Sequence, residues 1–322
     1  MIHLGIDLGT SNTLAAFVKD GKPVIYEFED GAMIPSIIYI EEPSGLEHVG
    51  AVALDKWADP EYDIKKSFRR WKLDLGEKEM IRHLNIGGVQ VPITPENLTT
   101  KMVEYVASQI GQGIGGEKIH SVLVTVPHGW RREKPEKCKL TRKAAAEAVC
   151  EGIRINVQET TVSEPVAAAA YWIWAMRNDG NKEVPDLDGK TILVCDIGGG
   201  TFDLSLVAVG SPGKPLDVIQ AAHNNYAGDY VDALIVAEVC RAFNGKYGSA
   251  YPESAEEVLT LLDSESHPWI RPWFVQAKED WKETISMRIA STADLNSIVP
   301  VKGNFDDGEQ ILRHKMTVDD FT

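Results

Sequence analysis

The stretch GIDLGTSNT, from Gly5 to Thr13, decides the fold, because a second version of it, CDIGGGTFDLS, returns at Cys195 to Ser205. In each stretch an apolar run ends at an aspartate, glycine follows, and a second β-rich stretch begins. The two aspartates, Asp7 and Asp196, are separated by more than half of the chain. Such self-similarity predicts a duplicated unit that consists of a strand, a glycine turn and a strand.

Both turns carry residue types that suit phosphate binding. Glycine lets the backbone approach a ligand closely, and successive N–H groups in such a turn form an anion-binding concavity. An aspartate beside the turn can hold the hydrated Mg²⁺ that accompanies a polyphosphate. One copy alone would equally fit a tight hairpin whose aspartate caps the turn. Two copies that agree with each other favour a phosphate site.

Strand and helix patterns alternate between and after the two turns. Strands are predicted at Thr13 to Val18, Pro23 to Phe28, Ile34 to Ile40, His120 to Val126, Arg154 to Val157, Phe202 to Val209, Leu216 to Ala222 and Ile298 to Val301. Helices are predicted at Asn97 to Ile110, Glu136 to Cys150, Pro165 to Met176 and Asp229 to Phe243, with helical segments through Ser291 and a new helix opening at Thr317. This alternation predicts a mixed α/β sheet covered by helices.

The duplication predicts two lobes. The polar stretch Asp179 to Asp188, which contains Gly and Pro, marks the boundary between them. We expect lobe I to be 1–186, with a core of 1–38 and 117–186 and an insertion of 39–116. Lobe II is then 187–322, with a core of 187–228 and 317–322 and an insertion of 229–316. Because the last predicted helix has barely opened, we expect lobe II to be incomplete and the chain to be a piece of a longer protein; a naturally shortened relative is the alternative.

The composition excludes several classes of protein. The 322 residues are 43% hydrophobic and 25% charged, as in ordinary folded proteins, and their net charge of −15 repels nucleic acid and anionic membranes. No apolar run reaches the length of a membrane span, and the first residues lack the pattern of a secretory signal. The four cysteines form no C-x-x-C pair. We therefore expect no nucleic-acid or membrane partner and a cytoplasmic location.

Five stretches resemble, in order and at the right spacing, the nucleotide-binding domain of DnaK-like seventy-kilodalton heat-shock chaperones, which belong to the actin and sugar-kinase superfamily. These stretches are GIDLGTSNT, LVTVP (Leu123 to Pro127), SEPVAAAAY (Ser163 to Tyr171), CDIGGGTFDLS and AGDYVD (Ala227 to Asp232). The first phosphate loop alone would also fit a small-molecule kinase or an actin-like filament ATPase. The Glu-Pro-alanine stretch and GGGTFD are typical of the chaperone branch.

The resemblance, which spans essentially the whole chain, implies a duplicated ribonuclease-H-like fold of the actin-like ATPase type, with two lobes around a nucleotide cleft. It also implies that MgATP is bound and hydrolysed to ADP and phosphate as a conformational switch. The partners implied are the nucleotide, a C-terminal peptide-binding domain in the intact protein, and co-chaperones.

The same resemblance implies roles for individual residues. The aspartates Asp7, Asp196 and Asp203 match groups that hold Mg²⁺ through water. The expected phosphate-binding residues are Gly9, Thr10, Ser11, Asn12, Gly198, Gly199, Gly200, Thr201 and Gly228. The expected catalytic set is Lys65, Glu164, Asp196 and Thr201, in which Lys65 and Glu164 act on the γ-phosphate and the attacking water. Lys66 is the alternative to Lys65 if the register differs by one.

Simpler interpretations stay open for several of these residues. Pro127, which matches a proline that relays the nucleotide state, also serves as a strand terminator. Glu164 also fits as an acidic residue at a helix N-terminus. Lys65 also fits as part of a solvated or salt-bridged helix face, and the basic stretch His128 to Lys143 fits as a solvated surface.

The resemblance is weaker at the expected base pocket. Glu279, Lys282 and Ser286 match family residues that line the ribose and adenine, and their spacing places them on one face of an α-helix. Glu283 stands where the family usually has an arginine that stacks on adenine. Trp281 has no counterpart in the family pattern and is expected to be a packing residue.

Overall fold

The computed structural model describes residues 2–77, 82–114, 118–150, 152–178, 186–210, 214–248, 250–282, 296–305 and 308–317. The chain divides into two compact units. The first unit consists of Met1–Leu54, Phe68–Gly198 and Phe202–Asn224, and the second consists of Asp55–Ser67, Gly199–Thr201 and Asn225–Thr322.

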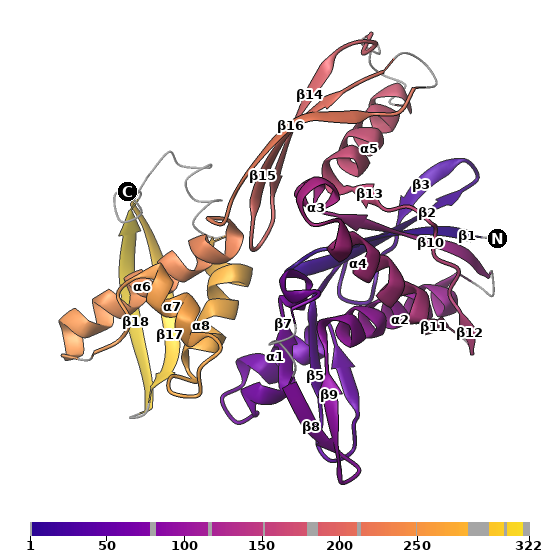
Figure 1. The fold of residues 1–322 in the computed structure, drawn as a ribbon. Helices are drawn as coiled ribbons and strands as arrows, with labels where there is room; N and C mark the ends of the chain where they lie inside the picture. The colour runs from indigo at the N-terminus through magenta and orange to yellow at the C-terminus, as the bar shows by residue number, and fades with distance from the viewer. Residues whose placement is uncertain are drawn as a thin grey trace. The chain divides into compact units, whose positions relative to one another are not determined.

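A six-stranded sheet forms the centre of the first unit (Figure 1). Its strands are β1 (Ile2–Leu8), β2 (Asn12–Lys19), β3 (Lys22–Ile25), β4 (Met33–Pro35), β10 (Ile119–Val126) and β13 (Val162–Ser163). The order is β13-β10-β1-β2-β3, with β4 paired to β2. Along β1, burial alternates strictly, so Ile2, Leu4, Ile6 and Leu8 enter the core and Asp7 lies on the opposite face.

β1 pairs with β10 in parallel and with β2 in antiparallel orientation. Because parallel neighbours need long crossovers, helices follow these strands. They are α2 (Pro95–Gly113), α3 (His128–Glu133), α4 (Pro135–Glu147) and α5 (Glu164–Asn178). In α2 a capping box between Thr94 and Asn97 satisfies the first backbone N–H groups, and an apolar stripe of Leu98, Met102, Val106 and Ile110 is buried.

Smaller elements complete the chain between β4 and β13. A three-stranded sheet consists of β5 (Ile37–Ile40), β6 (Glu47–Val49) and β7 (Ser67–Arg69). The helix α1 (Ala51–Ala58) and the 3₁₀ turn η1 (Ile64–Lys66) lie between β6 and β7, and the 3₁₀ turn η2 (Trp71–Asp74) follows β7. Two hairpins follow, β8 (Arg82–Ile86) with β9 (Val89–Ile93), and β11 (Val149–Cys150) with β12 (Ile153–Arg154).

The second glycine turn also lies between antiparallel strands. β14 (Thr191–Ile197), β15 (Phe202–Ala208) and β16 (Asp217–Asn224) form an antiparallel meander. The strands β1, β2 and β3 form a meander of the same kind. The predicted repeat of strand, glycine turn and strand is therefore confirmed.

The second unit is mainly helical. It contains α6 (Gly228–Tyr247), α7 (Ala255–Leu261), α8 (Ile270–Gln276), the π-helical turn η3 (Ala277–Trp281), and the hairpin β17 (Asn296–Phe305) with β18 (Gly308–Thr317). Phe243, Trp273 and Trp281 are buried in it. The buried Arg271 donates from Nε to the carbonyl oxygen of Trp57 at 2.7 Å, which ties α8 to the end of α1.

The mixed α/β class predicted from the alternation is confirmed, and most predicted elements exist. The predicted helix of Glu136 to Cys150 is shorter, because Val149 and Cys150 pair with β12. The predicted strand of Ile34 to Ile40 is two strands in different sheets. Thr317 ends β18, and the remainder of the helix predicted there lies outside the described residues, as do the helical segments predicted beyond Lys282. Within the described part of the chain, every helix is too short or too polar to cross a bilayer.

We predict that Gly9→Ala destabilises the fold and that Gly5→Ala, on the same strand and turn, does not. A Cβ on Gly9 would lie 2.1 Å from the carbonyl oxygen of Asn12, whereas a Cβ on Gly5 would meet the nearest atom at 3.7 Å. Overpacking of this kind costs about 1–3 kcal/mol. Denaturant unfolding of the two variants measures the difference, and equal stabilities would show that close packing is not what requires glycine at position 9.

Candidate functional site

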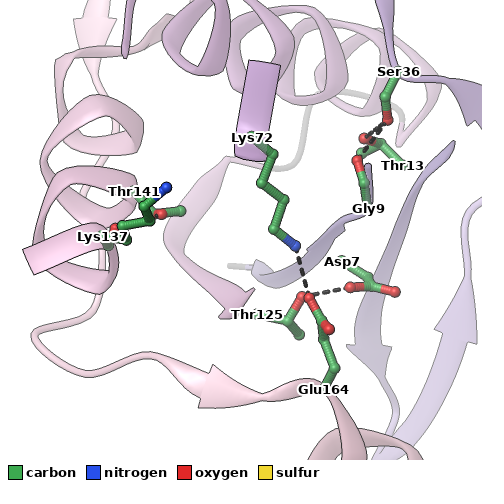
Figure 2. A network of polar contacts seen from close by, with 9 residues as sticks. All are labelled: Asp7, Gly9, Thr13, Ser36, Lys72, Thr125, Lys137, Thr141 and Glu164. Atoms are coloured by element: carbon green, nitrogen blue, oxygen red, sulfur yellow. Dashed lines mark hydrogen bonds and ion pairs between the residues drawn. The ribbon is translucent and has the colours of Figure 1, made fainter. Parts of the chain in front are cut away.

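The first glycine turn is held from the junction of β4 and β5. The Ser36 hydroxyl donates to the carbonyl oxygen of Gly9 at 2.9 Å and shares a 2.9 Å hydrogen bond with Thr13 Oγ1 (Figure 2). The backbone N–H of Ser36 donates to the carbonyl oxygen of Ser11 at 2.8 Å. Three hydrogen bonds that involve Ser36 therefore set the shape of this turn.

The Ser11 hydroxyl indicates whether this turn could bind a ligand. Its Oγ is buried and has no hydrogen-bond partner among the described residues. A buried hydroxyl that makes no hydrogen bond is costly, so such groups usually have a partner. A phosphate oxygen placed against the turn would supply one, and the residues here therefore fit the nucleotide that the sequence predicts.

Three aspartates approach one another at the ends of the central strands. Asp7 accepts a hydrogen bond from Thr125 Oγ1 of β10 (Figure 2). Asp196 and Asp203 lie directly opposite each other on β14 and β15. Burial raises the pKa of Asp196, and the charges of Asp7 and Asp203 raise it further. Like charges facing each other in this way are destabilising without a counter-ion.

The same three aspartates are the predicted ligands of Mg²⁺. Among the described residues, no three His, Cys, Asp or Glu side chains are placed to hold a metal ion directly. Mg²⁺ keeps several of its waters and is often bound through only one or two carboxylates. Asp7, Asp196 and Asp203 supply the oxygen ligands that a hydrated Mg²⁺ would need, and their assignment to the metal stays a prediction.

A buried ion pair lies beside the aspartates. Lys72 Nζ of η2 donates to Glu164 Oε1, at the start of α5, at 2.7 Å (Figure 2). The Lys72 side chain is only 4% exposed. Burial raises the pKa of Glu164, Lys72 opposes that rise, and Asp7 and Asp196 add to it. Glu164, Lys72, Asp7 and Asp196 therefore share one electrostatic environment.

A pocket of the first unit connects three of the predicted site residues. It lies between α3, the start of α5 and the strands β14, β15 and β16, and Glu164, Asp196 and Asp203 line it. His128 of α3 lines the same pocket, and its pKa is lowered by burial and by the charges of Arg131 and Arg132. The structure thus brings Glu164, Asp196 and Asp203 to one pocket, and their roles stay predictions.

The predicted catalytic lysine has a different neighbour. Lys65 belongs to the second unit, where its ammonium pairs with Glu265 at 2.7 Å and its side chain is 71% exposed. Lys66 Nζ lies 3.8 Å from Asp63. The lysine that contacts Glu164 is Lys72, which the sequence analysis did not single out. The sequence did contain a sign that Lys72 is buried, because the apolar residues Trp71, Leu73 and Leu75 surround it inside a basic stretch.

Buried side chains and hydrogen bonds fix the η2 turn, which carries Lys72. Trp71 is buried and donates from Nε1 to Thr99 Oγ1 at 3.3 Å, and Leu75 is fully buried. The Leu73 carbonyl oxygen accepts from Lys137 Nζ at 2.6 Å. The backbone at Arg70 is left-handed, with φ of 56°, so the chain turns sharply into η2. The ammonium is therefore held in place by structure that exists before any ligand binds.

The second glycine turn lies at a helix N-terminus. The backbone N–H of Asp229 donates to the carbonyl oxygen of Gly199 at 2.7 Å, and Gly228 is the first residue of α6. Helix N-termini attract anions through their free N–H groups. The structure places Gly199 against the first turn of α6, and Gly200 is buried; phosphate binding by Gly199, Gly200 and Gly228 stays a prediction.

The predicted base residues are only partly brought together. Lys282 Nζ donates to the buried Asp232 Oδ1 at 2.6 Å, and Glu279 is exposed. The turn that carries Glu279 is π-helical, with Lys282 N–H donating to the Ala277 carbonyl, so the α-helical spacing behind the prediction does not apply there. Trp281 is 1% exposed, which confirms that it is a packing residue. Ser286 and Glu283 lie outside the described residues.

We predict that Asp196→Asn stabilises the ligand-free protein at neutral pH. A raised pKa means that the folded state holds the Asp196 proton more tightly than the unfolded chain does. The stabilisation that this proton contributes is complete below the ordinary aspartate pKa of 3.8 and is lost as the pH rises through the raised pKa. Thermal melts at pH 7 should show a higher melting temperature for Asp196→Asn but not for Asp20→Asn, which changes an exposed turn. A lower melting temperature for Asp196→Asn would contradict the electrostatic account.

Comparison with known proteins identifies relatives along most of the chain. The family model described as Hsp70 protein matches residues 3–266. The Chaperone protein dnaK1 of Synechocystis sp. is 28% identical over 341 aligned residues, which cover 95% of this chain and 46% of that protein. The Chaperone protein DnaK of Thermus thermophilus is 28% identical over 81% of this chain and 41% of that protein, and the DnaK of Ureaplasma parvum is 30% identical over 82% and 39%.

The chain thus spans less than half the length of these curated relatives. They are all chaperones, so the small-molecule kinase and the actin-like filament protein are not favoured. The match of the family model over most of the sequence, together with the two glycine turns and the carboxylates around them, shows that this chain belongs to the Hsp70 family and is similar to DnaK chaperones.

Proposed function

We propose that the chain binds MgATP and hydrolyses it to ADP and phosphate, as the nucleotide-binding domain of a DnaK-like chaperone. The observation that carries this proposal is the buried Lys72–Glu164 ion pair, which shares its electrostatic environment with Asp7 and Asp196 in the first unit. A cation and a set of carboxylates beside a glycine turn are the parts that phosphoryl transfer to water requires.

Residues of both glycine turns and the three aspartates would bind the phosphates and Mg²⁺. Backbone N–H groups of the turn from Gly9 to Asn12, with the Ser11 hydroxyl, would hold phosphate oxygens. Asp7, Asp196 and Asp203 would hold the waters of Mg²⁺, which neutralises phosphate charge when bound. In the second unit, Gly199, Gly228 and Thr201 would hold the phosphates from the N-terminus of α6.

Glu164 would orient the attacking water. Its pKa is raised by burial, which makes the carboxylate a better proton acceptor than an exposed one. The ammonium of Lys72 lies on one carboxylate oxygen and would stabilise the negative charge that develops in the transition state. Because Lys72 is held before a ligand binds, this stabilisation needs no rearrangement during the reaction.

Two lysines are candidates for this role. The family resemblance favours Lys65, and the contact with Glu164 favours Lys72. We propose Lys72 as the lysine that acts at Glu164, and Lys65 stays the alternative that the motif predicts.

The remaining assignments extend the same proposal. The hydrolysis cycle would gate a C-terminal peptide-binding domain in the intact protein, with co-chaperones as further partners and the cytoplasm as the compartment. Glu279 and Lys282 would face the ribose and base; Lys282 would first have to release Asp232, which it contacts at 2.6 Å.

We predict that the two lysines differ in their effect on hydrolysis. Single-turnover conversion of MgATP by the purified full-length protein should slow by roughly 10²–10³-fold in Lys72→Met, because a preorganised charge is lost. Lys65→Met should change it by less than about threefold, because an exposed ion pair contributes little.

Nucleotide binding, measured by calorimetry, and thermal melts control for misfolding in both variants. The opposite ranking, with Lys65→Met the slower enzyme, would return the role to the motif lysine. Absence of ADP formation by the unmodified protein would overturn the proposed function itself.

A further inference from the structure

Trp130 of α3 lies against the buried ion pair, although no motif of the sequence includes it. Lys72 Nζ lies 5.8 Å from the centroid of the Trp130 ring, and Lys137 Nζ lies 5.6 Å from the same centroid. The indole is half-buried. Ammonium groups within about 6 Å of an indole face are attracted by the negative potential of the ring.

The two lysines depend on this ring to different degrees. Lys137 is anchored elsewhere, since it donates to the Leu73 carbonyl oxygen at 2.6 Å and lies 3.5 Å from Glu77 Oε1. The Lys72 ammonium contacts Glu164 and lies over the Trp130 ring. A lysine has four rotatable side-chain bonds, so contacts at the end of the side chain, as well as the fixed backbone of η2, decide where its ammonium lies.

We propose that Trp130 is a positioning residue that holds the Lys72 ammonium on Glu164. The ring attracts the cation, and its apolar body keeps water away from the pair. Lys137 supports this arrangement indirectly, because it fastens the backbone of η2 and covers the same ring. The inference rests on the proposed function only where it concerns hydrolysis; the positioning of Lys72 is a property of the ligand-free protein.

Placement in the fold supports this role. α3 begins where β10 ends, and its residues His128, Gly129 and Arg132 line the pocket that contains Glu164 and Asp196. Trp130 therefore belongs to the same six-residue helix as one wall of that pocket. A side chain in this position can set the geometry of Lys72 without contacting the nucleotide.

A double-mutant cycle in the full-length protein tests the proposal. Single-turnover hydrolysis of MgATP is measured for Trp130→Leu, Lys72→Met and the double variant. Trp130→Leu should slow hydrolysis by roughly tenfold, as loss of a desolvated cation–π contact would. In the Lys72→Met background it should cause no further slowing, because the group that it positions is gone.

Two further variants separate positioning from packing. Trp130→Phe keeps an aromatic face and should retain most of the rate, whereas Trp130→Leu should not. Lys137→Met removes an anchor of η2 and should slow hydrolysis only where Lys72 is present. Equal slowing by Trp130→Leu in both Lys72 backgrounds, or equal slowing by Phe and Leu, would show a structural role and overturn the proposal.

A second measurement does not depend on hydrolysis. In the ligand-free protein, ¹⁵N NMR of lysine ammonium groups should show a slowly exchanging signal that disappears in Lys72→Met. Trp130→Leu should accelerate its exchange, and Trp130→Phe should not. Unchanged exchange in Trp130→Leu would overturn the positioning role even if ATP is hydrolysed. Accelerated exchange without hydrolysis would confirm the positioning and refute the proposed function.

Discussion

The buried contact between Lys72 and Glu164 is the interaction on which the site depends. It joins residues 92 positions apart, from a 3₁₀ turn and from the first residue of α5. Removing either partner would leave a buried charge without compensation, which is far more costly than losing both. The turn that carries Lys72 is accordingly held by several contacts, which involve Trp71, Thr99, Leu75 and the Leu73 carbonyl oxygen.

The acidic groups around this pair work against stability. Asp196 faces Asp203 across two strands, and Asp7 bears on both Asp196 and Glu164. Lys72 offsets part of this repulsion, and a bound cation would offset more. The ligand-free fold thus holds more negative charge than its own lysine neutralises at this place. Such a compromise between stability and ligand binding is typical of functional sites.

Different contacts hold the backbone of the two glycine turns in place. In the first unit, the turn after β1 is held by the hydroxyl and backbone of Ser36, and Gly9 is required because the Asn12 carbonyl approaches it closely. In the second unit, Gly199 is held by the first turn of α6. In both turns, hydrogen bonds from a neighbouring segment to glycine carbonyl oxygens fix the backbone, which is what a pair of phosphate-binding loops would need.

The family resemblance, rather than any local pattern, led us to expect Glu164, Asp196 and Asp203 at one site. By itself, the sequence determined the mixed α/β class, the repeated turn and the helices α2, α5 and α6. These features depend on local signals, namely apolar periodicity, glycine and the acidic residue that ends each strand. The helix α1 and the β8–β9 hairpin were not predicted, although the Gly87-Gly88 pair that joins the two strands of the hairpin is itself a local signal.

Only the tertiary structure decided which lysine meets Glu164. Lys65 and Lys72 stand in one basic stretch, and motif spacing favoured Lys65; burial of Trp71 and Leu75 instead draws Lys72 inward, while Lys65 pairs with Glu265. The π-helical turn at Ala277–Trp281 is a similar case, since the sequence reads as an α-helix there. An ion pair between distant residues has no local signature, and its partners become neighbours only when the chain has folded.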